Sequence, residues 1–259
     1  MNVCCRKFET LICMIELLQV TGGVTGTSVP TLCGNLDNQH VIYTPITNFP
    51  ARLSIVTDQT SSSTSTSAWR IKILQYECDS PMLAPDGCLQ FFTGISGNVS
   101  SFNYKTTENT LAATNPNQIS SLNYNICLRR ESGYCAVEWS TVGPTYDVKG
   151  TFSVSGDFSA APSPVTASEA ITRDANCVND YVVIPQGYGT SSGSLPVDRY
   201  CGQALGGCSD ATCTANVLGP IRTSVIPFSL GVVTDADETT ASDVGNTGFQ
   251  LFYKQQPCA

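Results

Sequence analysis

Charged residues, and basic ones above all, are scarce in this chain of 259 residues. Only 13% of the residues are charged, against the ~25% usual in globular proteins. Acidic residues outnumber basic ones by 21 to 13, which gives a formal net charge of −8. The sequence therefore lacks the basic patch that attracts nucleic acids or anionic lipids, and we expect neither as a partner.

Histidine is almost absent, because His40 is the only one in the chain. A Ser–His–Asp or Cys–His catalytic group would have to use this residue, whose flanking sequence predicts a short polar turn that enters a strand. Gly-x-Ser-x-Gly, His-Glu-x-x-His and phosphate-loop motifs are missing, as are Cys-x2-Cys pairs with a nearby histidine. We therefore predict neither an enzyme nor a zinc site.

Long apolar runs are also missing. No stretch approaches the ~20 apolar residues that a membrane-spanning helix needs. The first residues do not form an export signal either, since Glu9 and Glu16 interrupt the apolar stretch and no small-residue cleavage site follows. Residues 1–12 receive no assignment from the sequence.

Cysteine, by contrast, is abundant, with 13 residues. The chain also has an N-glycosylation sequon at Asn98-Val99-Ser100. This density of cysteine is typical of proteins that mature in an oxidising, extracellular compartment. We therefore predict a secreted glycoprotein with disulfide bonds, modified at Asn98.

An internal repeat accounts for the missing export signal. Residues 13–78 align with residues 177–258. Cys33-Gly34 matches Cys201-Gly202, and the alternating runs 69–75 and 249–255 both lead to a cysteine. Residues 79–176 have no upstream counterpart. We therefore expect an unassigned segment 1–12, a partial module 13–78 and a complete module 79–259. The first module is N-terminally incomplete, either because the sequence is truncated, which we favour, or because this copy has lost its start.

The complete module resembles the CUB domain family. The residues that carry the resemblance are Cys88–Gly94, Gly97–Tyr104, Tyr124–Cys127, Cys177–Ile184, Cys201-Gly202, Thr234-Asp235 and Gly248–Tyr253. Ser101-Phe102-Asn103-Tyr104 and Gly133-Tyr134-Cys135 are similar to motifs of arthropod secreted proteins with two such modules. The resemblance implies an all-β fold, an antiparallel β-sandwich of the CUB jelly-roll type.

The resemblance also implies a disulfide framework. The expected pairs are Cys88–Cys127, Cys177–Cys201, its repeat Cys13–Cys33, Cys135–Cys258 and a local Cys208–Cys213. Cys78 repeats Cys258, so we expect its partner in the missing early half; Cys4 or Cys5 could substitute, but two adjacent cysteines at a terminus are a poor replacement. The odd cysteine count would then reflect the lost half-module.

A calcium site is a further implication, because many CUB domains hold Ca²⁺ with carboxylates. Asp180 and Asp235 match two of the family's ligand positions, and Asp237 could add a third. Thr172 stands where the family has a glutamate, and Glu169 and Asp174 lie nearby but out of register. In the partial module, Glu16 and Asp58 hold the positions of Asp180 and Asp235. The alternative is that Asp180 and Asp235 only cap loops.

The expected function is recognition or adhesion. We predict a non-catalytic extracellular protein that binds a protein or glycan through the loops 157–176, 185–200, 206–216 and 235–247. The glycine-rich stretch 187–193 is interpreted as a flexible hairpin tip, and Arg129-Arg130-Glu131 as an ion pair at a strand end. The alternatives are a structural component of a matrix, cuticle or secretion, and an accessory region of an extracellular protease.

Overall fold

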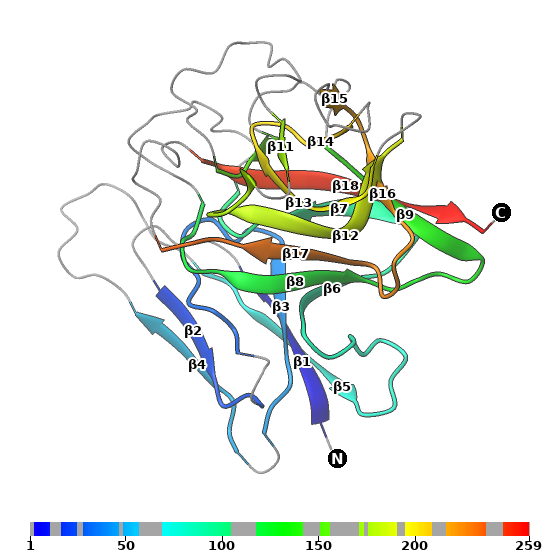
Figure 1. Ribbon diagram of the computed structural model, residues 1–259. Helices are drawn as coiled ribbons and strands as arrows, with labels where there is room; N and C mark the ends of the chain where they lie inside the picture. The colour runs from blue at the N-terminus through cyan, green and yellow to red at the C-terminus, as the bar shows by residue number, and fades with distance from the viewer. Residues whose placement is uncertain are drawn as a thin grey trace. The chain divides into compact units, whose positions relative to one another are not determined.

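The structure is a computed structural model, and its strands are shown in Figure 1. It describes residues 3–10, 17–24, 28–46, 49–56, 69–104, 118–141, 151–155, 171–173, 176–190, 195–208, 216–236 and 246–258. The chain divides into two compact units, Met1–Phe91 and Phe92–Ala259. Among the described residues there is no α-helix, and none that could cross a membrane.

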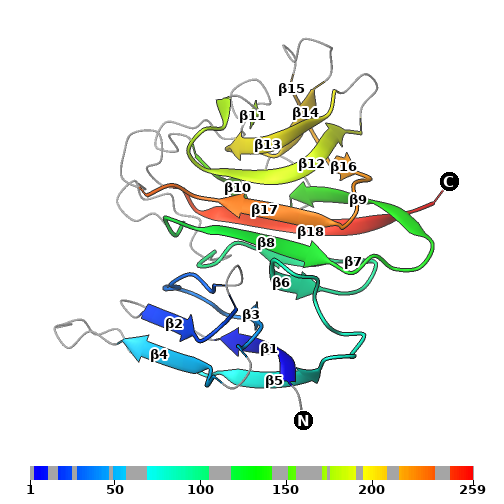
Figure 2. The same ribbon diagram turned by 60° about the horizontal axis from the view of Figure 1, so that its bottom comes forward.

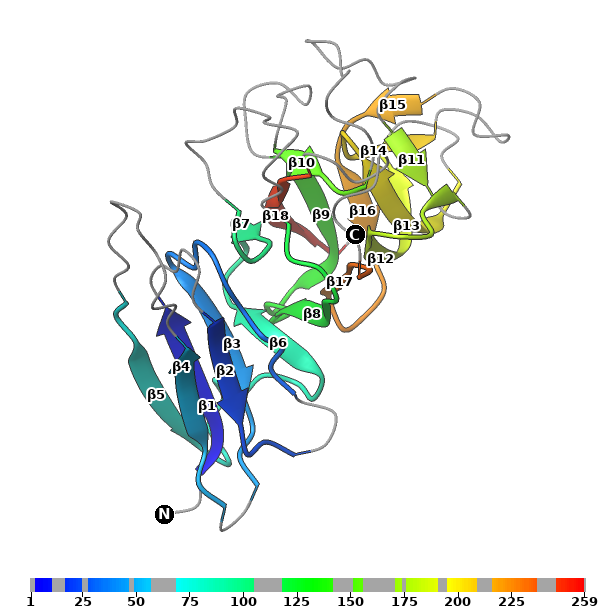
Figure 3. The same cartoon turned by 90° about the vertical axis from the view of Figure 1, so that its left-hand side faces the viewer.

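The first unit contains five strands in two small antiparallel sheets. The strands are β1 (Val3–Thr10), β2 (Leu17–Thr21), β3 (Gln39–Tyr43), β4 (Arg52–Val56) and β5 (Lys72–Glu77). β1 lies between β3 and β5, and β2 pairs with β4 (Figures 2 and 3). Residues 3–10 of the N-terminal segment that the sequence left unassigned are therefore the central strand of a sheet.

The second unit is built on one curled antiparallel sheet. Its strands are β6 (Cys88–Phe92, which spans the boundary), β7 (Ser96–Ser100), β8 (Asn123–Leu128), β9 (Tyr134–Thr141), β10 (Phe152–Ser153), β11 (Ile171–Arg173), β12 (Tyr181–Gly189), β13 (Val197–Gly202), β14 (Gly206–Cys208), β15 (Asn216–Leu218), β16 (Ile221–Thr223), β17 (Ser229–Val233) and β18 (Gly248–Pro257). The order is β10-β18-β9-β16-β12-β17-β8-β6, with β7 on β18, β13 on β12 and β11 on β13, while β14 and β15 pair separately. The predicted all-β antiparallel sandwich is confirmed.

The core of the second unit follows from the period-2 pattern of its strands. Phe249, Leu251 and Tyr253 on β18 are all buried, as the alternation predicts. The indole of Trp139 on β9 is fully buried, and its centroid lies 6.1 Å from that of the Tyr253 ring. Burial of each such side chain contributes about 1.5–3 kcal/mol, so the β9–β18 pair anchors the sandwich.

Glycine within β12 has a packing role that the sequence analysis misassigned. Gly187 lies inside the strand, and a Cβ there would come within 2.7 Å of the Tyr200 hydroxyl and 2.8 Å of Ile221. The predicted flexible tip is therefore wrong for its first three residues, which are strand. Glycine is needed because side chains of neighbouring strands approach this backbone closely.

The two units share the register of their corresponding strands. The sequence alignment matches Leu17 with Tyr181 and Val56 with Val233. In the structure Leu17 lies opposite Val56, and Tyr181 lies opposite Val233. The next two residue pairs along each ladder correspond in the same way. β2 and β4 thus repeat the pairing of β12 and β17 without a shift.

A second, independent pairing repeats as well. Leu18 forms a bridge with Leu32, and their counterparts Val182 and Tyr200 pair in the second unit. The glycines that follow two residues after Leu32 and Tyr200 both have positive φ, 76° and 95°. The internal repeat seen in the sequence is therefore a repeat of backbone geometry.

Candidate recognition strand and carboxylate pair

Strand β5 and the residues just before it differ from their repeat counterparts in β18 in their exposure to solvent. The alignment matches Trp69 with Phe249 and Ile73 with Tyr253. Phe249 and Tyr253 are 1% and 2% exposed, whereas Trp69 and Ile73 are 58% and 50% exposed. Two of the three residues whose counterparts form core in the second unit are thus exposed in the first, Trp69 just before β5 and Ile73 within it, while Ile71 between them is partly exposed.

The second edge of β5 has no paired strand in the described part of the first unit. Among the described residues β5 pairs with β1 alone, whereas β18 pairs with β9 on one edge and β7 on the other. In that ladder Gly97 of β7 lies opposite Tyr253, and a Cβ at Gly97 would come within 2.9 Å of the tyrosine ring. A strand beside β18 therefore needs a small residue opposite the large one.

Strand β4 shows the same difference. Its counterpart β17 lies between β12 and β8, but β4 pairs only with β2 in the described part of the chain. Leu53 of β4 is partly exposed, while its counterpart Leu230 is fully buried. The strands that flank β17 and β18 on these edges are β8 and β7, respectively, and the described residues of the first unit supply no equivalents.

The carboxylates predicted to hold calcium are partly brought together. Asp180 is fully buried, and its Oδ1 accepts a hydrogen bond of 2.8 Å from the backbone N–H of Asp235. Asp237 lies outside the described residues. Asp180 therefore makes the loop-capping contact of the alternative interpretation.

The neighbouring acidic positions add no third ligand that the structure describes. Thr172 lies in β11, with its backbone opposite Cys201. Glu169, Asp174, Glu16 and Asp58 all fall outside the described residues. In the part of the chain that is described, no group of three His, Cys, Asp or Glu residues could hold a metal ion. Two carboxylates supply only a part of the six to eight oxygens that Ca²⁺ takes.

Two of the expected disulfides are present in the second unit. Cys135 is bonded to Cys258, and Cys177 to Cys201, with Cα–Cα distances of 4.8 and 5.7 Å. The first bond joins the start of β9 to the residue after β18, and the second joins the segment before β12 to β13.

Other cysteines follow the expected framework less completely. Cys88, Cys127 and Cys78 are each disulfide-bonded. Cys33 is a free thiol, so the structure does not contain the expected Cys13–Cys33 bridge. Burial raises the pKa of this thiol. Cys13 itself lies outside the described residues. The Cys208–Cys213 pairing stays a prediction, because Cys213 also lies outside them.

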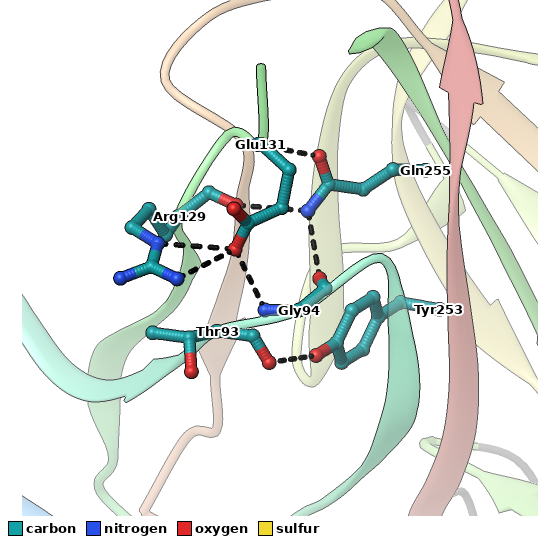
Figure 4. Close-up of polar contacts among 6 residues, drawn as sticks. All are labelled: Thr93, Gly94, Arg129, Glu131, Tyr253 and Gln255. Atoms are coloured by element: carbon teal, nitrogen blue, oxygen red, sulfur yellow. Dashed lines mark hydrogen bonds and ion pairs between the residues drawn. The ribbon is translucent and has the colours of Figure 1, made fainter. Parts of the chain in front are cut away.

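A buried polar cluster at one end of the second unit was not predicted beyond its ion pair (Figure 4). Gln255 is 2% exposed; its amide nitrogen donates to the carbonyls of Gly94 and Arg129, at 2.9 and 2.8 Å, and its oxygen accepts from Glu131 N–H at 3.0 Å. The Tyr253 hydroxyl donates a hydrogen bond to the carbonyl of Thr93, next to Gly94 in the β6–β7 turn. One side chain of β18 thus ties together the β6–β7 and β8–β9 turns.

The predicted ion pair at this end is confirmed. Glu131 Oε1 lies 3.0 Å from Arg129 Nη2 and accepts a hydrogen bond of 2.8 Å from the Gly94 N–H. That backbone hydrogen bond, followed by the hydrogen bond and charge of Arg129, holds the pKa of Glu131 below its usual value of 4.5. The carboxylate is therefore stabilised in its charged form by the fold.

The only histidine is engaged in the backbone of the first unit. His40 is buried, and its Nε2 lies 3.0 Å from the N–H of Phe91 and 3.1 Å from the carbonyl of the same residue. Beside it, the Gln90 amide donates to Gln39 at 2.7 Å. Asp37 and Asn38 form the polar turn before β3, as the sequence predicts.

The predicted binding loops lie largely outside the described residues. Residues 185–189 and 197–200 belong to β12 and β13, so the prediction of a loop over 185–200 is wrong at both ends. The described parts of the segments 157–176 and 206–216 contain β11, β14 and the start of β15. Asn98, the sequon residue, is exposed on β7.

The fold and its cross-links define a class of protein, the antiparallel β-sandwich domain held by disulfides that is common outside the cell. The family model for the animal CUB domain matches residues 85–256, and the chain belongs to this family. CUB domains are generally non-catalytic extracellular modules that bind other proteins. A comparison with curated proteins found no matching sequence.

Proposed function

We propose that this CUB protein is a non-catalytic recognition protein that binds another polypeptide, and that β5 is a strand it presents. The observation that carries the proposal is the contrast between β5 and β18. Trp69 and Ile73 are exposed, while Phe249 and Tyr253 at the same positions of the repeat are buried. Exposed apolar groups at a strand edge mark a surface where a partner can dock.

The partner that fits is an extended segment that adds a strand antiparallel to β5. The backbone groups on the open edge of β5 would pair with the incoming strand, as β18 pairs with β7. By analogy with Gly97 opposite Tyr253, the segment would place a small residue opposite Ile73. Covering Trp69 and Ile73 would contribute about 1.5–3 kcal/mol for each side chain that becomes fully buried.

A strand peptide tests the edge directly. A fluorescent peptide with the sequence of residues 95–104, which contains β7, is titrated with the full chain and followed by anisotropy. We expect saturable binding that weakens at least tenfold in Ile73→Lys. Val178→Lys, on a residue of the second unit that is 70% exposed, is the matched control and should bind as the wild type does. Absence of saturable binding, or equal affinity in Ile73→Lys, contradicts the proposal.

The other functions considered differ in what they require. Glycan binding through the long loops predicts that Ile73→Lys leaves ligand affinity unchanged. A structural role in a matrix, cuticle or secretion predicts no saturable binding at all. An accessory role beside a protease predicts a catalytic domain in the same polypeptide. The β5 proposal is preferred because it rests on side chains whose exposure is described.

Calcium binding by Asp180, Asp235 and Asp237 remains a proposal, supported by the contact between the first two residues. The full chain, freed of metal with a chelator, is titrated with Ca²⁺ by calorimetry. We expect binding in the range of about 10⁻⁴–10⁻³ M that is typical of extracellular modules. Asp235→Asn should abolish the heat, and Asp86→Asn, an exposed carboxylate elsewhere, should not. No heat at millimolar Ca²⁺ would end the proposal.

A further inference from the structure

The N-terminal strand of the first unit occupies the place that β9 has in the second. β1 lies between β3 and β5, and β9 lies between β16 and β18. Strands β5 and β18 are already matched by sequence, each leading to a cysteine, Cys78 or Cys258. The strand that pairs with β5 should therefore correspond to the strand that pairs with β18.

The registers make this correspondence specific to the residue. Phe8 lies opposite Ile73, and Trp139 lies opposite Tyr253. Because Ile73 and Tyr253 are equivalent in the alignment, Phe8 is the counterpart of Trp139. The third strand of each sheet agrees, since both aromatic residues pair on their other side with a buried aliphatic residue of β3 or β16.

β1 carries an irregularity at its start. Val3 lies opposite Glu77 and Cys5 lies opposite Tyr76, so that two steps along β1 span one step along β5. The residue without an opposite partner is Cys4. This is the pattern of a β-bulge, in which one extra residue is left out of the ladder.

β9 carries the same irregularity at the same place. Tyr134 lies opposite Pro257 and Ala136 opposite Gln256, which again leaves out one residue, Cys135. The two bulges fall at equivalent steps, because Glu77 and Tyr76 align with Pro257 and Gln256 in the repeat. Cys4 is therefore the counterpart of Cys135.

The second unit shows what a cysteine in this bulge does. Cys135 is bonded to Cys258, across a Cα–Cα distance of 4.8 Å. Cys78 is the repeat counterpart of Cys258, and it is disulfide-bonded. We propose that Cys4 is the partner of Cys78, so that one disulfide fastens the first strand of the unit to its last.

Forming this bond is a two-electron oxidation. Each thiol loses a proton, and the pair of electrons passes to the disulfide of a thiol–disulfide oxidoreductase, which becomes a dithiol. The new S–S bond closes a loop from Cys4 to Cys78, almost the whole described length of the first unit. The repeat alone predicts a partner of Cys78 in a missing segment, with Cys4 or Cys5 as a substitute; the strand register favours Cys4.

Mass spectrometry of the full chain tests the pairing. The unreduced protein is alkylated under denaturing conditions and digested, and electron-transfer fragmentation between Cys4 and Cys5 locates the linked residue. We expect the fragment that contains Cys78 to be linked through Cys4. Linkage through Cys5, or to a cysteine outside residues 1–12, overturns the proposal.

Two adjacent variants provide the matched comparison. In Cys5→Ser, Cys78 should stay protected from alkylation, and in Cys4→Ser it should be alkylated. The reciprocal variant Cys78→Ser should expose Cys4, which keeps the test informative if Cys4→Ser folds poorly. Protection of Cys78 in Cys4→Ser together with alkylation in Cys5→Ser would assign the bond to Cys5 and contradict the inference.

Discussion

Gln255 is the single side chain on which the turn end of the second unit depends most. Replacing it by leucine keeps the volume and the apolar stem but removes three hydrogen bonds, to Gly94, Arg129 and Glu131. A net contribution of about 1 kcal/mol for each bond gives a loss of about 3 kcal/mol in the free energy of unfolding. The backbone groups of both turns would also need new partners, so the turns should loosen together.

The assay must report on the second unit alone. The chain has two tryptophans, Trp69 in the first unit and Trp139 in the core of the second. In a Trp69→Phe background, tryptophan fluorescence during chemical denaturation follows Trp139. Gln256→Leu is the matched control, because this neighbour makes one side-chain hydrogen bond, to Glu138, and is partly exposed. We expect the control to lose about 1 kcal/mol or less.

The comparison between the two glutamines decides the matter. If Gln255→Leu lost no more stability than Gln256→Leu, the buried amide would not hold the turns together. A denaturation curve of Gln255→Leu that matches the wild type, as followed by Trp139 fluorescence, would lead to the same conclusion.

Two further predictions concern the same unit. The hydrogen bond from the Gly94 N–H lowers the pKa of Glu131. The Glu131 carboxylate therefore stabilises the fold above its usual pKa, and this contribution is lost as the pH falls through the lowered pKa. The difference in unfolding free energy between wild type and Glu131→Gln, measured by denaturation, should shrink below about pH 4.5. Gly248→Ala should cost about 3 kcal/mol, since φ is +79° and the new Cβ would overlap Ser101 Oγ, whereas Gly133→Ala, with φ +84° and open space, should cost about 1 kcal/mol in the same assay. A flat pH difference, or equal losses at the two glycines, would contradict these assignments.

Much of the fold could be predicted from local pattern. The alternation at 249, 251 and 253 specifies which face of β18 is buried, and the repeat predicts a strand over 69–75, of which 72–75 lie in β5. Arg129 and Glu131 lie two residues apart in the sequence, so their ion pair could also be predicted from local pattern. These features depend on neighbours along the chain.

What escaped prediction depends on contacts between distant segments. Val3–Thr10 has no period-2 pattern, and it is a strand because β3 and β5 pair with it on both sides. Gln255 continues the inward face of β18, but its partners lie 124 to 161 residues away. Gly187 looked like a flexible tip because the side chains that exclude a Cβ come from other strands.

The central claim is that this CUB protein recognises another polypeptide through strand β5 of its first unit. The most direct measurement is surface plasmon resonance of the immobilised full chain against a panel of secreted and cell-surface proteins. The account predicts saturable binding of at least one of them, weakened tenfold or more by Ile73→Lys and unchanged by Val178→Lys. Saturable binding that both variants retain, or no saturable binding in the panel, would contradict it.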